Sequence, residues 1–224
     1  GKLKADFKLT EVYELIHKLQ PQALIGSNHH LSPNPGEDFQ MFEKDLPGKG
    51  TKNFATSADD IGNLPLEVCE TINGSWGFNL QDRKHKSEKE LVQYLVKAAG
   101  YGSNLLLNVG PMPNGKIQEE HIESLKKIGK WVKQNGQTIY NTKRGPIAPS
   151  DEIASTQNGN IIYIHLLDNK KLEYNIEGFN SKFKKITYLN SGKKVSIEKS
   201  KEGLSIFLDD KEIDHIDTIL KMEL

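Results

Sequence analysis

Three segments of the chain carry residues that could take part in chemistry, and the first is Asn28-His29-His30. These residues follow a short apolar stretch at 23–26, where a strand would end. Adjacent histidines can bind a metal ion, can hydrogen-bond to a ligand hydroxyl, or can be plain loop residues. The sequence contains no HxH or HxxxH spacing, which disfavours a metal site. Hydrogen bonding to a ligand and a plain loop both stay open.

The second segment ends at Glu43. This residue closes a short alternating stretch expected to form a strand at 38–42, and it is preceded by Met41 and Phe42. A carboxyl group at a strand end beside apolar side chains has partly desolvated surroundings that suit a general acid. An ordinary solvent-facing glutamate is the alternative.

The third segment runs from Glu67 to Gly77 and contains Trp76 between small residues after an expected strand. An indole face left open there would suit a sugar ring, whose C–H face stacks on aromatic side chains, whereas a tryptophan packed in the core is the alternative. The sequence has no Gly-rich phosphate loop, GxSxG elbow or CxxC pair. Pattern alone therefore predicts a carbohydrate-type site with no cofactor and no metal.

Helices that would position these residues are expected at three places. Apolar residues at helical spacing predict a helix that Thr10 can cap and that ends at Pro21. Ser87 and Glu90 have capping-box spacing and predict a second helix, up to about residue 102. A long amphipathic helix is expected at 118–135, with Trp131 on its core face.

Strands are expected between these helices at 23–26, 38–42, 66–72 and 104–109. The last of them, NLLLNV, is a continuous apolar run typical of a parallel strand that is buried on both faces. Helices alternating with such strands predict an α/β fold with a parallel sheet. In such folds, functional residues gather where strands end and the following loops begin.

Beyond about residue 145 the pattern changes to short strands separated by turn residues. Six are expected, at 161–167, 171–176, 184–189, 194–198, 204–208 and 217–223. A spacing of about ten residues with Asn-Gly and Ser-Gly turns favours an antiparallel sandwich. The overall expectation is thus α/β plus all-β, with a domain boundary within 143–150.

Composition excludes several other classes of protein. The 224 residues include 30 Lys+Arg and 30 Asp+Glu, so net charge gives no argument for nucleic acid as a partner. No apolar run approaches the roughly 20 residues of a transmembrane helix. The single Cys69 excludes an intrachain disulfide and a Cys-based zinc cluster.

Three segments together resemble α-L-fucosidases of glycoside hydrolase family 29. They are EVCETINGSWG at 67–77, NLLLNVGPMP at 104–113 and the helix through Gly129-Lys130-Trp131. The likeness runs from residue 1 to about 143, and a C-terminal β-sandwich also belongs to that family. It implies that residues 1–145 are the C-terminal half of a (β/α)8-like barrel and that residues 146–224 are a small antiparallel β-sandwich.

The resemblance also implies a retaining, exo-acting glycosidase that removes terminal α-L-fucose from oligosaccharides or glycoproteins. Retention needs two carboxyl groups, one a nucleophile and the other an acid that later serves as a base. The family's acid/base segment matches 39–43, so Glu43 takes that role, and the aromatic wall beside the fucose methyl group matches Trp76. The substrate-binding set implied in this way is Asn28, His29, His30, Trp76 and Glu67.

One feature of the family is absent from the sequence, the nucleophile in a Trp-Phe-Asp-Gly type motif. The resemblance then implies that the chain is the C-terminal portion of such an enzyme, that its partner is the missing N-terminal half of the barrel, and that the chain alone is inactive. A non-catalytic carbohydrate-binding or accessory fragment is the alternative. The sequence itself does not indicate a compartment, whereas the resemblance suggests an extracytoplasmic one.

Overall fold

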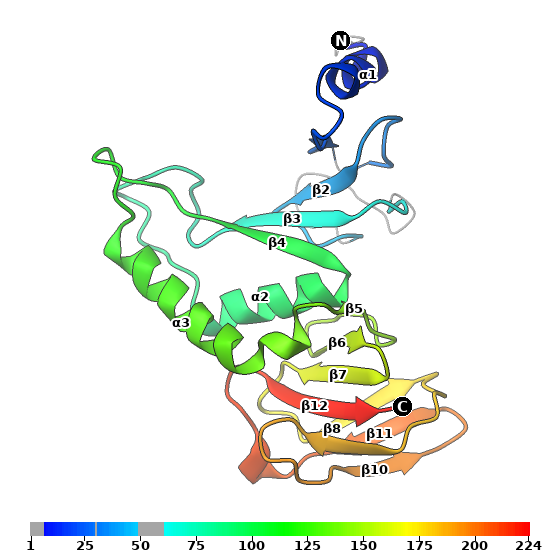
Figure 1. Cartoon of the computed structure of the whole chain (residues 1–224). Coiled ribbons are helices and arrows are strands. Elements are labelled where there is room, and N and C mark those ends of the chain that lie inside the picture. The colour runs from blue at the N-terminus through cyan, green and yellow to red at the C-terminus, as the bar shows by residue number, and fades with distance from the viewer. Residues whose placement is uncertain (1–6, 30, 49–60) are drawn as a thin grey trace, which may run out of the picture. The chain divides into compact units, whose positions relative to one another are not determined.

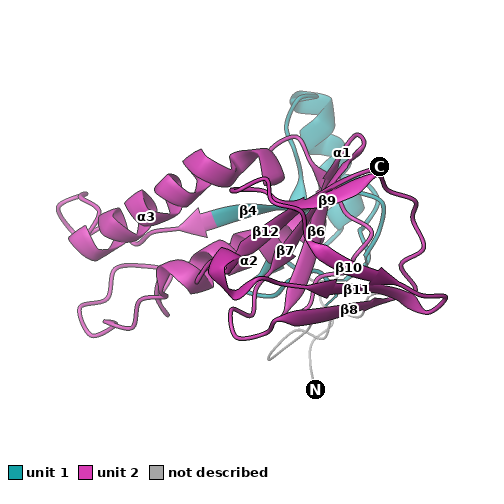
Figure 2. Cartoon of the chain, turned by 90° about the horizontal axis from the view of Figure 1, so that it is seen from below, with its two compact units in different colours: residues 1–70, 103–106 teal, residues 71–102, 107–224 magenta. Residues whose placement is uncertain are grey.

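The structure is a computed structural model of the chain that describes residues 7–29, 31–48 and 61–224. The chain divides into two compact units, shown in different colours in Figure 2. The first contains residues 1–70 and 103–106, and the second contains residues 71–102 and 107–224. His30 and residues 49–60 lie outside the described residues.

The first unit is built from one helix and a parallel sheet. The sheet order is β1-β2-β3-β4, with parallel pairing of β1 to β2 and of β2 to β3. This confirms the expected parallel sheet, although β1 begins three residues later than the expected strand. The elements are α1 (Leu9–Leu19), β1 (Gly26–Ser27), β2 (Phe39–Glu43), β3 (Leu66–Thr71) and β4 (Ser103–Asn108). The last residue of β3 and the last two residues of β4 belong to the second unit.

Two local predictions in this region are wrong. Helix α1 begins at Leu9, directly after Lys8, whose backbone is left-handed (φ 53°) and therefore not part of the helix. No side chain caps the helix, so Thr10 is not its cap. Strand β4 is not buried on both faces, because Leu106 is 49% exposed, and it stands at one end of the strand order. An apolar run is thus compatible with a strand at the edge of the described sheet.

Burial alternates along β2 and β3, as the period of two in a strand requires. Gln40 and Phe42 of β2 are buried, and Leu66 and Val68 of β3 are buried. The intervening side chains are half-buried. The register pairs Met41 with Glu67 and Glu43 with Cys69, so these four residues share the less buried face of the sheet.

The second unit contains two long helices and both antiparallel sheets. Helix α2 (Glu88–Gly100) begins with the expected capping box, in which the Glu90 amide donates to Ser87 Oγ (3.2 Å) and the Ser87 amide donates to Glu90 Oε2 (2.7 Å). Helix α3 (Glu119–Asn135) buries Trp131, which confirms the core position expected for that residue.

Eight strands follow these helices. One sheet has the order β5-β6-β7-β12-β9 and the other β10-β11-β8, and all their printed pairings are antiparallel. The six expected strands are confirmed to within a few residues, and two further strands, β5 and β6, were not expected. The strands are β5 (Lys143–Arg144), β6 (Ile153–Asn158), β7 (Ile161–Leu166), β8 (Glu173–Glu177), β9 (Lys185–Tyr188), β10 (Ser196–Lys199), β11 (Gly203–Phe207) and β12 (Thr218–Glu223).

The five-stranded sheet is the middle layer of this unit (Figure 1). One hydrophobic cluster joins it to α2 and α3 through residues such as Val92, Trp131 and Tyr163. A second cluster joins it to the three-stranded sheet through residues such as Ile164 and Ile206. Because both faces of β7 are covered, its side chains are buried on both faces and are mostly apolar instead of alternating, with His165 as the polar exception.

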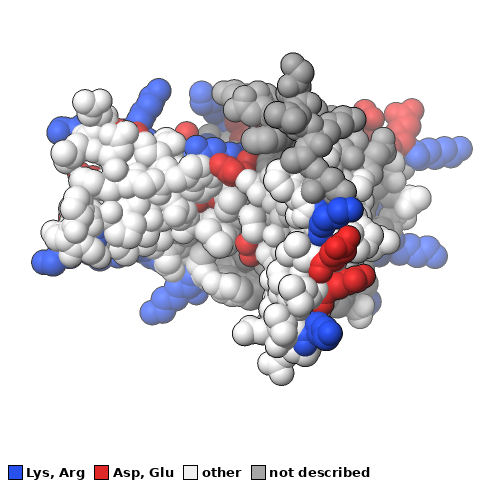
Figure 3. All heavy atoms as spheres, turned by 90° about the horizontal axis from the view of Figure 1, so that it is seen from above, with Lys and Arg blue, Asp and Glu red and all other residues white. Residues whose placement is uncertain are grey.

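Charged side chains of both signs lie side by side on the face shown in Figure 3. Within the described parts of that face, Lys and Arg are not segregated from Asp and Glu, in keeping with the formal net charge of +0. Among the described helices, none has the length and apolar character needed to cross a membrane.

Candidate active site

Glu43 is the last residue of β2 and is half-buried. Asn28, directly after β1, donates a hydrogen bond from Nδ2 to Glu43 Oε2 over 2.6 Å. The two residues lie at the carboxyl ends of the neighbouring parallel strands β1 and β2. Ligand sites of α/β folds lie at this edge of the sheet. A short bond to a carboxylate oxygen fixes the direction of the carboxyl group.

Glu67 and Cys69 share the sheet face with Glu43. Burial is the main cause that raises the pKa of the Cys69 thiol, and the nearby carboxylates of Glu43, Glu67 and Glu70 raise it further. The thiol therefore stays protonated at neutral pH, so it is a poor nucleophile. The chemistry available on this face is that of carboxyl groups.

His29 uses both of its ring nitrogens within the protein. The Leu31 amide donates to His29 Nδ1 (3.0 Å), so the proton of a neutral ring is on Nε2. That nitrogen is 2.9 Å from Oε1 of Glu37, a buried carboxylate. Asn34 also binds Glu37, with its backbone amide (3.1 Å) and its side-chain amide (3.1 Å). His29 is thereby anchored by a buried acid that the sequence pattern had not singled out.

Asp38 anchors the beginning of β2 in the same unit. Its Oδ2 accepts from the Ile25 amide (2.8 Å) and lies 2.9 Å from His17 Nε2. The bond from Ile25 and then the bond from His17 lower the pKa of the Asp38 carboxyl group. This carboxylate links helix α1, the residue before β1 and the start of β2.

Trp76 lies in the second unit, in the turn after β3, and is half-buried. Asn108, the last residue of β4, donates from Nδ2 to the Trp76 carbonyl oxygen over 2.8 Å. The Thr71 hydroxyl is 3.1 Å from the Ser75 carbonyl oxygen, and Lys86 Nζ donates to the Thr71 carbonyl oxygen over 2.7 Å. The turn that carries the indole is therefore held by hydrogen bonds from three side chains.

Two close contacts complete this turn. A Cβ on Gly110 would lie 2.5 Å from the backbone carbon of Gly77, so only glycine allows the two loops to approach this closely. A Cβ on Gly74 would lie 3.1 Å from Asp82 Oδ2, so Asp82 packs closely against the turn from the loop that follows it. The neighbouring Ser75 hydroxyl is the main cause that lowers the pKa of Asp82.

The structure brings together only some of the residues expected from the sequence. Asn28 and Glu43 are in direct contact, and Glu67 shares their sheet face. Trp76 belongs to the other unit, and His30 lies outside the described residues.

The sequence did not predict Asn108 and Lys86 as supports of Trp76. An asparagine at the end of an apolar strand was the available signal for Asn108. Within residues 7–29, 31–48 and 61–224, no three His, Cys, Asp or Glu residues are placed to hold a metal ion.

Comparison with known proteins identifies the family. A family model described as Alpha-L-fucosidase matches residues 2–137. Plasma alpha-L-fucosidase of Homo sapiens is 30% identical over 161 residues, covering 60% of this chain and 34% of that protein. Alpha-L-fucosidase of Branchiostoma floridae is 39% identical over 165 residues, covering 62% of this chain and 37% of that protein.

A solved structure agrees with these sequence matches. Alpha-L-fucosidase isoenzyme 1 from Paenibacillus thiaminolyticus superposes with a TM-score of 0.77 at 29% identity, covering 97% of this chain and 53% of that one. The chain belongs to the alpha-L-fucosidase family, and its mixed α/β fold is similar to that of a solved member. It spans about a third of the length of the curated relatives it matches, 34% for the human plasma protein.

Proposed function

We propose that the chain is a portion of a retaining, exo-acting α-L-fucosidase that hydrolyses terminal α-L-fucose from oligosaccharides or glycoproteins. The observation that carries this proposal is the Asn28–Glu43 hydrogen bond of 2.6 Å at the carboxyl ends of two parallel strands, in a chain that belongs to this family. The relatives matched are named alpha-L-fucosidases.

Glu43 is proposed as the general acid/base. In the first step its carboxyl group would protonate the glycosidic oxygen while a second carboxylate attacks the anomeric carbon from the opposite side. In the second step the Glu43 carboxylate would take a proton from the water that releases fucose. The Asn28 amide would hold the carboxyl group in one orientation through both steps.

The second carboxylate is proposed to come from outside these 224 residues, because the family's Trp-Phe-Asp-Gly type motif does not occur among them. In a retaining enzyme the two carboxyl groups stand about 5–5.5 Å apart, so the missing segment would have to reach Glu43 closely. We accordingly propose that the partner of this chain is the N-terminal half of the barrel and that the chain alone is inactive.

The binding roles follow the same proposal. Trp76 would stack on the fucose ring, and Asn28, His30 and Glu67 would contact its hydroxyl groups. His29 would take part mainly by holding the loop, since both of its ring nitrogens already have partners. Fucosylated glycans are the proposed substrates, and their usual location outside the cell suggests an extracytoplasmic enzyme.

The finer architecture is part of the proposal too. The parallel order of β1 to β3 supports a half-barrel over residues 1–145, and two antiparallel sheets that share one hydrophobic cluster support a β-sandwich over 146–224. Helices α2 and α3 pack against the five-stranded sheet, which is why the compact units do not follow that boundary.

The test uses a longer protein that contains this chain and the missing barrel half. Removing a general acid slows substrates with poor leaving groups far more than activated ones. We therefore expect Glu43→Ala to lower kcat/KM about 10²–10⁴-fold for a disaccharide, and much less for a dinitrophenyl fucoside. Azide should restore part of the activity of this variant on the activated substrate, with fucosyl azide as the product. Equal losses on both substrates, without rescue, would remove Glu43 from this role.

The matched control is Glu198→Gln, which changes an exposed glutamate on β10. It should leave both rates unchanged. A non-catalytic carbohydrate-binding fragment, the alternative function, would be indicated if the longer protein bound fucosides without turning them over.

A further inference from the structure

A cavity of about 450 Å³ lies in the second unit beside the turn that carries Trp76. Its walls come from the loop 78–85 after that turn, from Met112 in the loop after β4, and from Gln118 and Glu120 at the start of α3. This volume is within the range of small-molecule sites, about 300–1,000 Å³. Both loops follow strands of the parallel sheet at their carboxyl ends, the edge at which α/β folds bind ligands.

We propose that this cavity binds the sugar unit to which the terminal fucose is attached. The inference rests on the proposed function, because it takes Trp76 as the fucose-binding residue. It goes beyond that function by naming a second subsite and the residues that form it.

The lining of the cavity fits a neutral sugar ring. Phe78 and Met112 offer apolar surface for the C–H face of a ring, and Arg83, Glu120 and His85 offer donors and acceptors for its hydroxyl groups. The positive charge of Arg83 is opposed by the carboxylates that line the same cavity. The cavity therefore has no excess of positive charge that would select a sulfated or carboxylated sugar.

The floor of the cavity holds polar atoms without partners. Gln118 Nε2 lies 3.2 Å from His85 Nε2, while the Oε1 atom of Gln118 is buried and accepts no hydrogen bond from the described residues. Behind them His121 is 1% exposed, packs edge-on against His85 at 5.3 Å, and has no partner for either ring nitrogen within the same described part. Buried polar groups left unpaired are costly. Turning the Gln118 amide toward the cavity would give its oxygen a sugar hydroxyl as donor, a side-chain change of the kind common on binding.

The cavity wall and the Trp76 turn are joined by contacts within the second unit. Asn79 lines the cavity and donates from Nδ2 to the hydroxyl oxygen of Ser75, next to Trp76 in the chain, over 3.2 Å. Phe78 follows Gly77, against which Gly110 is packed without room for a side chain. A sugar held at Trp76 and a second sugar in the cavity would thus contact one braced pair of loops.

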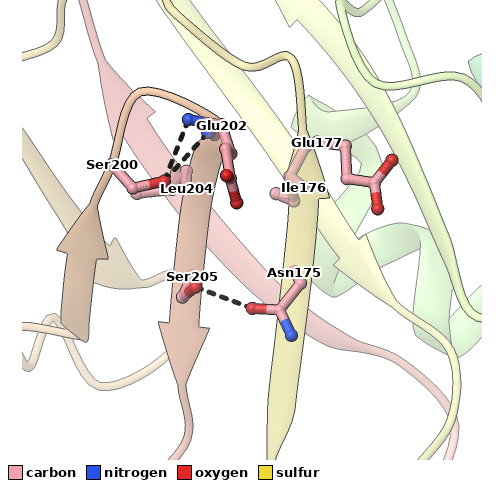
Figure 4. Close-up of a pocket in the computed structure, with 8 residues that line it drawn as sticks. Asn175, Ile176, Glu177, Ser200, Glu202, Leu204 and Ser205 are labelled. Carbon is pink, nitrogen blue, oxygen red and sulfur yellow. Dashed lines mark hydrogen bonds between the residues drawn. The ribbon is translucent and has the colours of Figure 1, made fainter.

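Another cavity described in the chain does not offer such a site. This cavity has a volume of about 260 Å³ and is lined by residues of β8, of β11 and of the turn before β11 (Figure 4). Three of its polar side chains already have partners within its lining, as Ser205 donates to Asn175 Oδ1 over 2.6 Å and Ser200 Oγ accepts from the Gly203 amide over 3.2 Å. It has no aromatic side chain among its lining residues.

The experiment titrates a longer ¹⁵N-labelled protein that contains this chain and the missing barrel half. This protein carries Glu43→Ala so that it does not hydrolyse the probes, and its amide resonances are followed with two kinds of probe. The first probe is methyl α-L-fucopyranoside, and the second is a set of fucosyl disaccharides covering the 1,2, 1,3, 1,4 and 1,6 linkages. At least one disaccharide is expected to shift the amides of Phe78, Arg83 and Gln118. The methyl fucoside should shift only the turn around Trp76.

Two variants sharpen this test. Phe78→Ala should raise the Kd of the responding disaccharide roughly three- to tenfold by removing the stacking surface. Arg83→Met, at an exposed position where folding is not at risk, should also raise it. The matched aromatic control is Tyr140→Ala, which changes a 63% exposed residue on a different cavity and should leave the Kd unchanged.

The outcomes separate this inference from the proposed function. If the methyl fucoside shifts the Trp76 turn but no disaccharide shifts the cavity amides, the subsite is refuted and the proposed function stands. If a disaccharide shifts the cavity amides while the methyl fucoside leaves the Trp76 turn unchanged, the cavity is a sugar site and the role of Trp76 is refuted. A Kd unchanged in both Phe78→Ala and Arg83→Met also refutes the subsite.

Discussion

Asn108 is the side chain whose removal should most directly loosen the Trp76 turn. Its Nδ2 donates to the Trp76 carbonyl oxygen over 2.8 Å and lies 3.3 Å from the Thr71 hydroxyl. Each net hydrogen bond contributes about 0.5–1.5 kcal/mol, and an acceptor left unsatisfied costs about 1–3 kcal/mol. Asn108→Ala should therefore lower the free energy of unfolding by about 1–3 kcal/mol. For a chain of this size that corresponds to a fall in Tm of about 2–12 °C.

The assay is urea denaturation of the variant beside Asn104→Ala. Asn104 is exposed and lies on the same strand, so the two substitutions share the change in strand propensity and differ in the hydrogen bonds. Asn104→Ala should stay within about 0.5 kcal/mol of the parent chain. If the two variants unfold at the same urea concentration, Asn108 does not hold the turn.

Three further predictions concern other contacts. Gly110→Ala should lower stability by about 1–3 kcal/mol in a thermal melt, because its Cβ would overlap the facing backbone at 2.5 Å, and a parent-like Tm would contradict this. The hydrogen bond from the Ile25 amide lowers the pKa of Asp38 in the folded chain. The stability that this carboxylate contributes is therefore complete above the unfolded pKa of about 4 and is lost as pH falls through the folded pKa. Asp38→Asn should make the urea midpoint depend less on pH over that acid range, and an unchanged pH dependence would refute the assignment. His165 Nδ1 and Asp217 Oδ2 are 2.6 Å apart with both side chains 0% exposed, so Asp217→Ala should cost about 3–5 kcal/mol in urea denaturation, and a loss below 1 kcal/mol would contradict this.

Elements with a local signal were predictable from the sequence. The capping box at Ser87 depends only on residues three positions apart, and it forms as expected. Strand β6 had no such signal, because its buried residues include Ser155 and Thr156. These hydroxyls are satisfied by distant groups, as Thr156 Oγ1 donates to the Thr138 carbonyl oxygen over 2.6 Å and Ser155 Oγ donates to that of Ile147 over 2.9 Å. Only the tertiary structure supplies those partners.

One contact of the candidate site could be expected from the sequence, whereas the supports of the candidate residues could not. A glutamate at a strand end and an asparagine after the neighbouring strand could be read from the chain, and the structure places them 2.6 Å apart. The buried acid Glu37 behind His29 could not be predicted, since nothing in its local sequence indicates burial. The exposure of Leu106 in β4 depends on what packs against its face of the sheet, and an apolar run does not contain that information.

The most direct test of the central claim measures release of fucose from a fucosyl disaccharide, a substrate whose poor leaving group needs a general acid. The 224-residue chain and a longer protein that contains the missing barrel half are assayed side by side, each with and without Glu43→Gln. Turnover is expected only in the longer protein, and it should fall about 10²–10⁴-fold in its Glu43→Gln variant. Turnover by the 224-residue chain alone, or full activity of the longer Glu43→Gln protein, would contradict the account.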